Sequence, residues 1–572
     1  MMKKKSVAIV LCILGLLLFA CSKKDESKPA ASAAKSEAVQ KQEAARPKLS
    51  GLSIAVPETF SDEDVFGYAC AKNLSGLLDT VDSWTAKVNP EMPAGTAKMS
   101  AGQYFGDPTM AGLDSSRQMA ILFLNPKKYS TVAVLYVPVT DASKMKDGIE
   151  QRGGLTVLRD NILVVADENE TIMKGVALLP KVQPLMSKTP DADIVVSLDV
   201  ESLMRIFGDD MKQKIKDLKT QMNVMQMQEQ SAEQMKMMDA QIDEAIKFVE
   251  EIKSIAFKAD AKSDSLEISA MCEAKKGTDL ERLMQVTNVP PQSMVKFLPD
   301  GGIKVSVCGD YDSLSEIGNQ IGERLMSKSG AMNKQQIETM KKITALKKEA
   351  IAGEAAICLF IPSGQGGLNG AIFYKVKDAA KALELIRMAK EQLMLSNTSA
   401  DVTTTVDYAE KARQAEGVDV HTMDISISST NPMATQQMAM FIPGGKLNME
   451  MAIVKDVMIY SIGTTIDPFI KTVKEDGGSN QIAAFKDFPA GAQVYGDLDV
   501  AKTVKTLMTP MFAAMSALMS PEQNPLTALD KVIAPPVTFT AMIADGKASG
   551  KIKISLDTIL KMQESLKGLG IK

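Results

Sequence analysis

The chain has 572 residues, a formal net charge of −4 and one histidine, His421. No cluster of Lys and Arg occurs after residue 50, so the electrostatic signature of a nucleic-acid-binding protein is missing. A single histidine also excludes a histidine-rich metal site. The length predicts two to four domains with ample core.

The first twenty residues have the pattern of an export signal. Lys3, Lys4 and Lys5 precede the apolar run from Ser6 to Ala20, which is too short to span a bilayer as a helix. The sequence Leu-Phe-Ala-Cys that ends at Cys21 resembles the lipobox of bacterial lipoproteins. This resemblance implies that residues 1–20 are removed and that Cys21 is acylated as the new N-terminus. The alternative is an ordinary signal peptide with an incidental cysteine.

Residues 21–50 are predicted to be a disordered tether, because Lys, Glu, Ala, Ser and Gln dominate and offer little to bury. A flexible chain of this length has a typical span of roughly 30 Å. The several acyl chains of a lipoprotein would anchor it to the membrane stably. In the sorting rule of enterobacterial lipoproteins, an aspartate after the cysteine retains the protein in the inner membrane. Ser22 occupies that position, which favours the periplasmic face of the outer membrane.

The rest of the chain contains short sequences that occur twice and in the same order. "ILFLNP" from Ile121 matches "ICLFIP" from Ile357, and "VVSLDVESLM" from Val195 matches "VYGDLDVAKTV" from Val494. "FKADAKSDSLEIS" from Phe257 matches "MIADGKASGKIKIS" from Met542. Chance matches would not keep one order, so the sequence predicts a tandem duplication with halves 51–288 and 289–572.

The repeated pieces have readable local structure. Alternating apolar segments such as "TVAVLYV" predict strands with one buried face, and "LRDN" and "VKDV" predict tight hairpin turns. Asp199 and Asp499 follow strands and open helical patterns, as N-caps do. The predicted fold class is α+β, with antiparallel sheet units whose helices pack on one face, plus a methionine-rich helical pair.

That helical pair is predicted as an insert at about residues 203–253, where two stripes of apolar residues are out of phase with each other. Five methionines there are candidate contacts for a ligand or partner: Met222, Met225, Met227, Met235 and Met238. Their clusters resemble those of periplasmic copper(I) proteins, which implies thioether ligation. The chain has 38 methionines throughout, however, so methionine acting as an adaptable apolar filler is the favoured reading, and no metal is predicted.

No catalytic residue or cofactor is predicted. Cys70, Cys272, Cys308 and Cys358 form no CxxC pair and lie in apolar segments, so buried thiols are expected, with one or two disulfides left open. His421 is expected to be solvated or on an edge strand. Ser293 and Lys296 match a Ser-x-x-Lys pattern in an unsuitable context. The paired acids in "SDEDV" and "DDMKQ" are common on loops and helix starts, and nothing in the sequence fixes two carboxylates at the distance that a catalytic pair needs.

The leading functional hypothesis is a lipid-anchored cell-envelope protein of a non-enzymatic binding or scaffolding type, whose partner is unidentified and is either a protein or another envelope component. The alternative is a periplasmic carrier of a hydrophobic ligand or lipid, and a third hypothesis is an enzyme without a visible motif. Passages with a strand, Leu-Asp and a helix also resemble uncharacterised exported bacterial proteins with domains of unknown function. That resemblance implies no activity.

Overall fold

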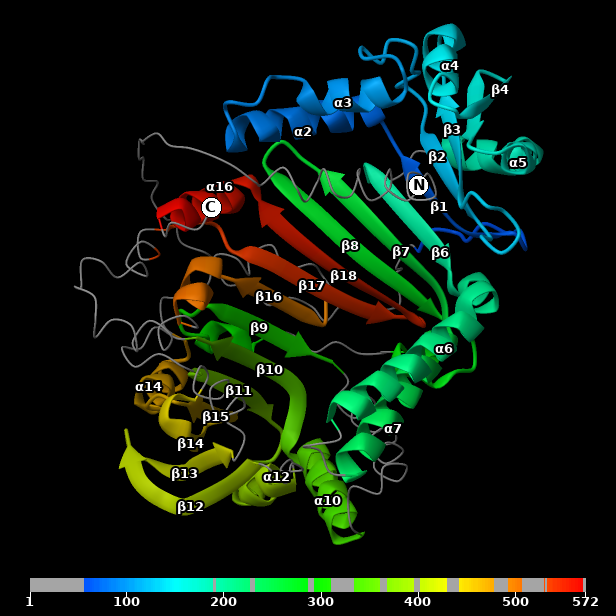
Figure 1. Ribbon diagram of the computed structural model, residues 1–572. Helices are drawn as coiled ribbons and strands as arrows, with labels where there is room; N and C mark the ends of the chain where they lie inside the picture. The colour runs from blue at the N-terminus through cyan, green and yellow to red at the C-terminus, as the bar shows by residue number, and fades with distance from the viewer. Residues whose placement is uncertain are drawn as a thin grey trace.

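The protein folds around one large antiparallel sheet with helices packed on it, as seen in a computed structural model (Figure 1). The structure describes residues 56–188, 192–226, 232–285, 293–309, 334–360, 368–395, 402–429, 442–477, 492–506, 529 and 532–568. Within these residues the sheet has 18 strands. The predicted combination of helices with antiparallel strands is confirmed at this level.

The first eight strands lie together in the order β4-β5-β3-β2-β1-β6-β7-β8. Their bounds are β1 (Val65–Ala71), β2 (Met119–Leu124), β3 (Ala133–Pro138), β4 (Leu155–Arg159), β5 (Ile162–Ala166), β6 (Ile194–Asp199), β7 (Ile252–Ala261) and β8 (Ser265–Ala274).

The later strands continue the same sheet in the order β18-β17-β16-β9-β10-β11-β15-β14-β13-β12. Their bounds are β9 (Ile303–Cys308), β10 (Ile351–Leu359), β11 (Gly370–Val376), β12 (Val402–Ala415), β13 (Val418–Ser429), β14 (Lys446–Val454), β15 (Val457–Ile462), β16 (Val494–Leu498), β17 (Val537–Ala544) and β18 (Lys547–Ser555). Antiparallel pairing of β8 with β18 joins the two sets.

The helices connect these strands. In the earlier part of the chain they are α2 (Leu74–Val88), α3 (Thr96–Tyr104), α4 (Ala142–Glu150), α5 (Asn169–Ser187), α6 (Val200–Gln226), α7 (Ala232–Glu251) and α8 (Asp279–Leu283). Those that follow are the 3₁₀ turn η1 (Met294–Phe297), α10 (Lys334–Ala350), α11 (Ala379–Arg387), α12 (Ala389–Leu395), the 3₁₀ turn η2 (Pro443–Gly445), α14 (Asp467–Lys474) and α16 (Leu556–Gly568).

Around β1, helices cover both faces of the sheet, whereas the sequence predicted helices on one face. Alternate residues of β1 enter two different cores. Ala69 and Ala71 pack with residues of α2, α3 and α4, and Tyr68 and Cys70 pack with residues of α5. Strands such as "MAILFL" are apolar on both sides, and a strand of that kind needs cover on both faces.

The hairpin turn and the helix N-caps predicted from the sequence are present in the structure. Asp160 and Asn161, with φ of 51° and 58°, join β4 to β5 in the left-handed conformation that two-residue hairpins favour. The Asp199 carboxylate accepts a hydrogen bond from the Ser202 amide at 2.9 Å, and Asp499 caps Lys502 in the same way at 3.0 Å.

The methionine-rich region forms two helices, α6 and α7, which contact each other. Figure 1 shows them near the ends of β6, β7 and β8. In the part of the chain that the structure describes, no helix combines the length and the apolar character needed to cross a bilayer.

Candidate functional site

The central strands carry apolar residues in continuous rows on one side. Residues opposite each other in antiparallel strands share a face, as do alternate residues of one strand. The register therefore assembles one surface from β7, β8, β18, β17 and β16. We call it the apolar face, and it consists of Phe257, Ala259, Ile268, Ala270, Gly550, Ile552, Phe539, Ala541, Val494 and Gly496.

Large side chains of the apolar face remain exposed. Phe257 is 44% exposed, Ile268 37% and Ile552 46%, although Ile268 and Ile552 lie opposite each other across β8 and β18. Phe539 lies flat on Gly496, where an added Cβ would come within 2.2 Å of the ring. Exposed apolar side chains gathered in this way mark contact sites for proteins, membranes or ligands.

Helical cover stops at one end of these strands. Trp84 and Val88 of α2 pack with Leu266 of β8 and Leu556 of α16. The Trp84 indole also donates a hydrogen bond of 2.9 Å to the Lys262 carbonyl in the β7–β8 turn. Ile268, the next residue of β8 on the same face after Leu266, lies outside this cluster and is exposed.

The opposite face of the same strands has a small apolar cluster around Ala256 and Met271, and next to it a group of charged side chains. Glu267 of β8 forms ion pairs with Lys262 at 2.8 Å and with Lys551 of β18 at 2.5 Å. Burial opposes ionisation of Glu267, but hydrogen bonds from the two lysines outweigh it and lower the pKa of this carboxyl. The central strands are thus amphipathic, and their apolar side is the one that has exposed Phe and Ile.

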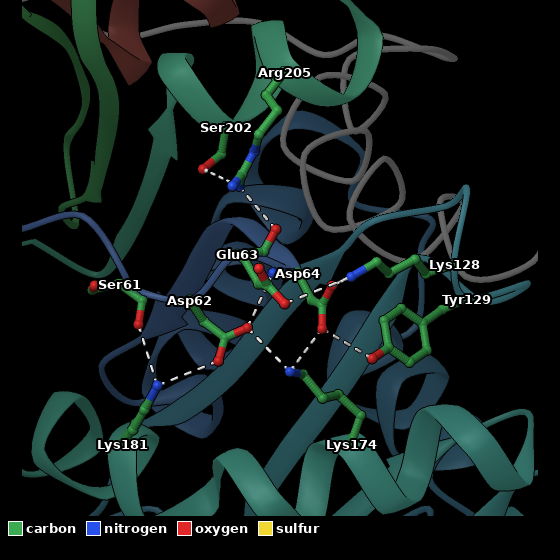
Figure 2. Close-up of polar contacts among 10 residues, drawn as sticks. All are labelled: Ser61, Asp62, Glu63, Asp64, Lys128, Tyr129, Lys174, Lys181, Ser202 and Arg205. Carbon is green, nitrogen blue, oxygen red and sulfur yellow. Dashed lines mark hydrogen bonds and ion pairs between the residues drawn. The ribbon is translucent and has the colours of Figure 1, made fainter.

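A second candidate is the charged cluster of Asp62 and Asp64 at the start of the described chain (Figure 2). Lys174 of α5 lies 2.9 Å from Asp64 Oδ2 and 3.1 Å from Asp62 Oδ1. Lys128 lies 2.6 Å from Asp64 Oδ1, and the Tyr129 hydroxyl donates to Asp64 at 3.2 Å. The cluster therefore fastens the segment before β1 to α5 and to the β2–β3 loop.

The same segment is also held by α6. Arg205 donates a hydrogen bond of 2.8 Å to the Glu63 carbonyl and one of 3.2 Å to the Ser202 hydroxyl, as Figure 2 shows. On the other side, Lys181 of α5 lies 3.3 Å from Asp62 Oδ2. Three parts of the fold thus converge on four consecutive residues, Ser61 to Asp64.

The electrostatics of this cluster suit structural ion pairs. Burial disfavours the charged form of Asp64, but hydrogen bonds from Lys128 and Lys174 outweigh it and lower the pKa of Asp64 to about 2. The pKa of Asp62 is lowered as well, because a backbone hydrogen bond and the two lysines of α5 overcome its burial. A general acid needs a proton near neutral pH, which neither carboxyl keeps.

The Ser-x-x-Lys pattern is not assembled as a reactive pair. The Ser293 hydroxyl donates to Glu354 at 2.8 Å, and Lys296 pairs with Asp476 at 2.6 Å. Burial raises the pKa of Glu354 despite a 2.6 Å hydrogen bond from the Met294 amide. These contacts attach η1 to β10.

A buried ion pair lies on the polar side of β9 and β16. Lys304 Nζ is 3.3 Å from Asp497 Oδ1, and Asp497 is fully buried without a hydrogen bond of good geometry. Burial raises the pKa of Asp497 in spite of Lys304. Cys358 of β10 is the strand partner of Lys304, and burial raises the pKa of its thiol to about 12, so Cys358 is no thiolate nucleophile at neutral pH.

Among the described residues, no disulfide links the four cysteines of the body. Cys70, Cys308 and Cys358 are buried as expected, and Cys272 is half-buried. His421 was expected to be solvated or on an edge strand, and this was wrong. It is 3% exposed on β13, which lies between β12 and β14, and its Nδ1 is 3.0 Å from the Tyr408 hydroxyl.

The structure does not bear on the other predicted site residues. Cys21 and Met227 lie outside the described residues. Met222, Met225, Met235 and Met238 belong to α6 and α7, but their side chains also lie outside what is described. Among the described residues, no three His, Cys, Asp or Glu side chains gather as a possible metal site.

Sequence reasoning missed Phe257, Ile268 and Ile552 as candidate contacts. The alternation in "IAFKADA", "SLEISA" and "SGKIKIS" does predict one apolar side for each strand. It carries no information on whether a helix covers that side, because cover depends on chain segments far away.

A comparison with known protein families, with curated proteins and with solved structures finds no match for this chain.

Proposed function

We propose that the protein is a lipid-anchored cell-envelope protein that binds a partner without catalysing a reaction, and that the apolar face is its binding surface. The observation that carries this proposal is the exposure of Phe257, Ile268 and Ile552 on a surface without charged side chains. A soluble body that leaves such residues exposed gains stability when a partner covers them.

The proposed anchor is an acylated Cys21 in the outer membrane, facing the periplasm. Its support is the lipobox-like sequence at residues 18–21 and the polar residues that follow. The Asp62–Asp64 cluster adds a mechanical argument, because ion pairs to α5 fasten the chain where the proposed tether would join the body.

We further propose that the body is a tandem duplication. Counted outward from the β8–β18 junction, the first set runs β8, β7, β6, β1, β2, β3, β5, β4, and the second runs β18, β17, β16, β9, β10, β11, β15, β14, followed by the additional strands β13 and β12. The matched sequences "ILFLNP" and "ICLFIP" fall on β2 and β10, which occupy the same place in each set. An experimental structure in which the two sets do not superpose strand for strand would contradict this proposal.

The second candidate function is a carrier of a hydrophobic ligand. It is favoured by the composition of the apolar face, which has no hydrogen-bonding side chain to orient a polar partner. A protein partner would normally meet some polar groups as well.

The test compares two neighbouring residues on opposite faces of β18. Ile552→Asp places a charge on the apolar face, and Lys553→Asp changes an exposed lysine on the polar face. Each variant is purified from membranes, and its bound proteins and lipids are measured by mass spectrometry. The proposal expects the amount of bound material to fall at least tenfold in Ile552→Asp and to stay unchanged in Lys553→Asp, relative to the unmodified protein. Equal binding by both variants and the unmodified protein would overturn it.

A further inference from the structure

The apolar face has a row of small residues beside a row of large ones. The small row crosses β8, β18 and β17 and consists of Ala270, Gly550 and Ala541. The adjacent row on the same strands consists of Ile268, Ile552 and Phe539. A Cβ built on Gly550 would meet nothing closer than 3.8 Å, so space remains above the small row.

These rows suit an acyl chain better than a polypeptide. None of the six side chains carries a charge or a hydrogen-bond donor or acceptor. An extended hydrocarbon chain needs no polar contacts along its length, whereas the surface of a protein partner brings polar groups that would lose their hydration here.

The position of the N-terminal segment points to a source for that chain. Val56, the first described residue, packs against the cluster formed by Ala256, Met271 and Ala544. These residues alternate with those of the apolar face on β7, β8 and β17, so Val56 lies directly behind that face. The segment that leads back to Cys21 therefore leaves the body one sheet thickness away from the apolar face.

The length of this segment is sufficient for the path around the sheet. β7 begins four residues before Ala256, directly after α7, and β8 ends three residues after Met271, so both strands stop at the same edge of the sheet. At about 3.4 Å per residue, with about 10 Å to pass the sheet edge, the path to the apolar face is roughly 35 Å. The stretch from Cys21 to Val56 is 35 residues long, and at about 3.4 Å per residue its greatest reach, roughly 120 Å, exceeds this path.

We propose that the apolar face holds the acyl chains attached to Cys21 of the same polypeptide when they are not inserted in the bilayer. This inference rests on the proposed lipid anchor. Attachment through a short tether makes the binding intramolecular, so the lipid is present at a high effective concentration. The body then competes with the membrane for its own anchor and stabilises a released, soluble form.

Photo-crosslinking tests this proposal with the full-length protein. The photoreactive residue p-benzoylphenylalanine replaces Ile552 in one variant and Lys553 in the control. Both proteins are produced with isotope-labelled palmitate, freed of detergent, irradiated and digested. Mass spectrometry then identifies what is joined to the β18 peptide. The proposal expects labelled acyl chain of the same molecule at position 552, at least fivefold above position 553, and no such product after Cys21→Ser.

The alternatives give different products. A free phospholipid, a second copy of the chain or another protein as the main product at position 552 would overturn the inference while leaving the anchor intact, provided that the N-terminal peptide carries acylated Cys21. An N-terminal peptide without acyl groups would instead remove the proposed anchor itself.

Discussion

Lys174 Nζ of α5 lies 2.9 Å from Asp64 Oδ2, and both side chains are mostly buried, at 21% and 9% exposure. Removing one partner of such a pair leaves the other charge without compensation. We expect Asp64→Asn to lower the free energy of unfolding by about 2 kcal/mol, measured by urea denaturation. Lys188→Met, which breaks the exposed pair with Glu58, is the control and should change it by less than about 0.5 kcal/mol. Equal effects would contradict the structural role of this cluster.

The same carboxyl makes stability depend on pH in the acid range. The pKa of Asp64 is about 2 in the folded protein, below its ordinary value of 3.8. Its contribution is therefore fully present above about pH 4 and is lost as the pH falls toward 2, a change of about 2 kcal/mol. Asp64→Asn should flatten the stability profile in this window. Hydrogen bonds from Arg413 and Thr465 also lower the pKa of Asp467 to about 2. Asp467 should therefore retain part of the pH dependence of stability in the variant. A variant profile as steep as that of the unmodified protein would contradict the ion pair.

His421 provides a single-site titration, because the chain has no other histidine. Burial lowers the pKa of His421 from its ordinary 6.5. The unfolded chain therefore takes up this proton first, and stability should decline as the pH falls below 6.5. An NMR titration of the imidazole signals should give a midpoint below 6.5 in the folded protein. A midpoint at or above 6.5 would contradict burial as the dominant influence on the pKa of the ring.

The thiols of the body should differ in their reaction with iodoacetamide. Burial raises the pKa of Cys70 and of Cys358 to about 12, and Cys272 is the most accessible of the four. Under native conditions Cys272 should react first, followed slowly by the others, as measured by peptide mass spectrometry. After unfolding without reductant, all four should react. A need for reductant would reveal a disulfide.

Local features of the fold could be predicted from the sequence because they depend on neighbouring residues. The N-cap at Asp199 and the turn at Asp160 and Asn161 are of this kind. The pairing of β8 with β18 joins residues far apart in the chain, and the alternation within each strand does not encode it. His421 has polar neighbours in sequence, yet pairing with β12 and β14 buries it.

The candidate site was less predictable than the fold. An alternating strand predicts an apolar side, and such sides are usually covered, so the sequence pattern alone does not predict that Ile552 is exposed. Its exposure depends on where α2 and α16 end, which is a property of the assembled structure.

Protection of position 552 in native membranes tests the central claim most directly. Ile552→Cys and Lys553→Cys are compared by the rate of maleimide labelling, with peptide mass spectrometry to separate them from the natural cysteines. The account predicts that Ile552→Cys is labelled at least tenfold more slowly in membranes than in protein stripped of bound material and of its own acyl chains, while Lys553→Cys is labelled at the same rate in both. Equal labelling of Ile552→Cys in the two preparations would contradict the claim that the apolar face is a binding surface.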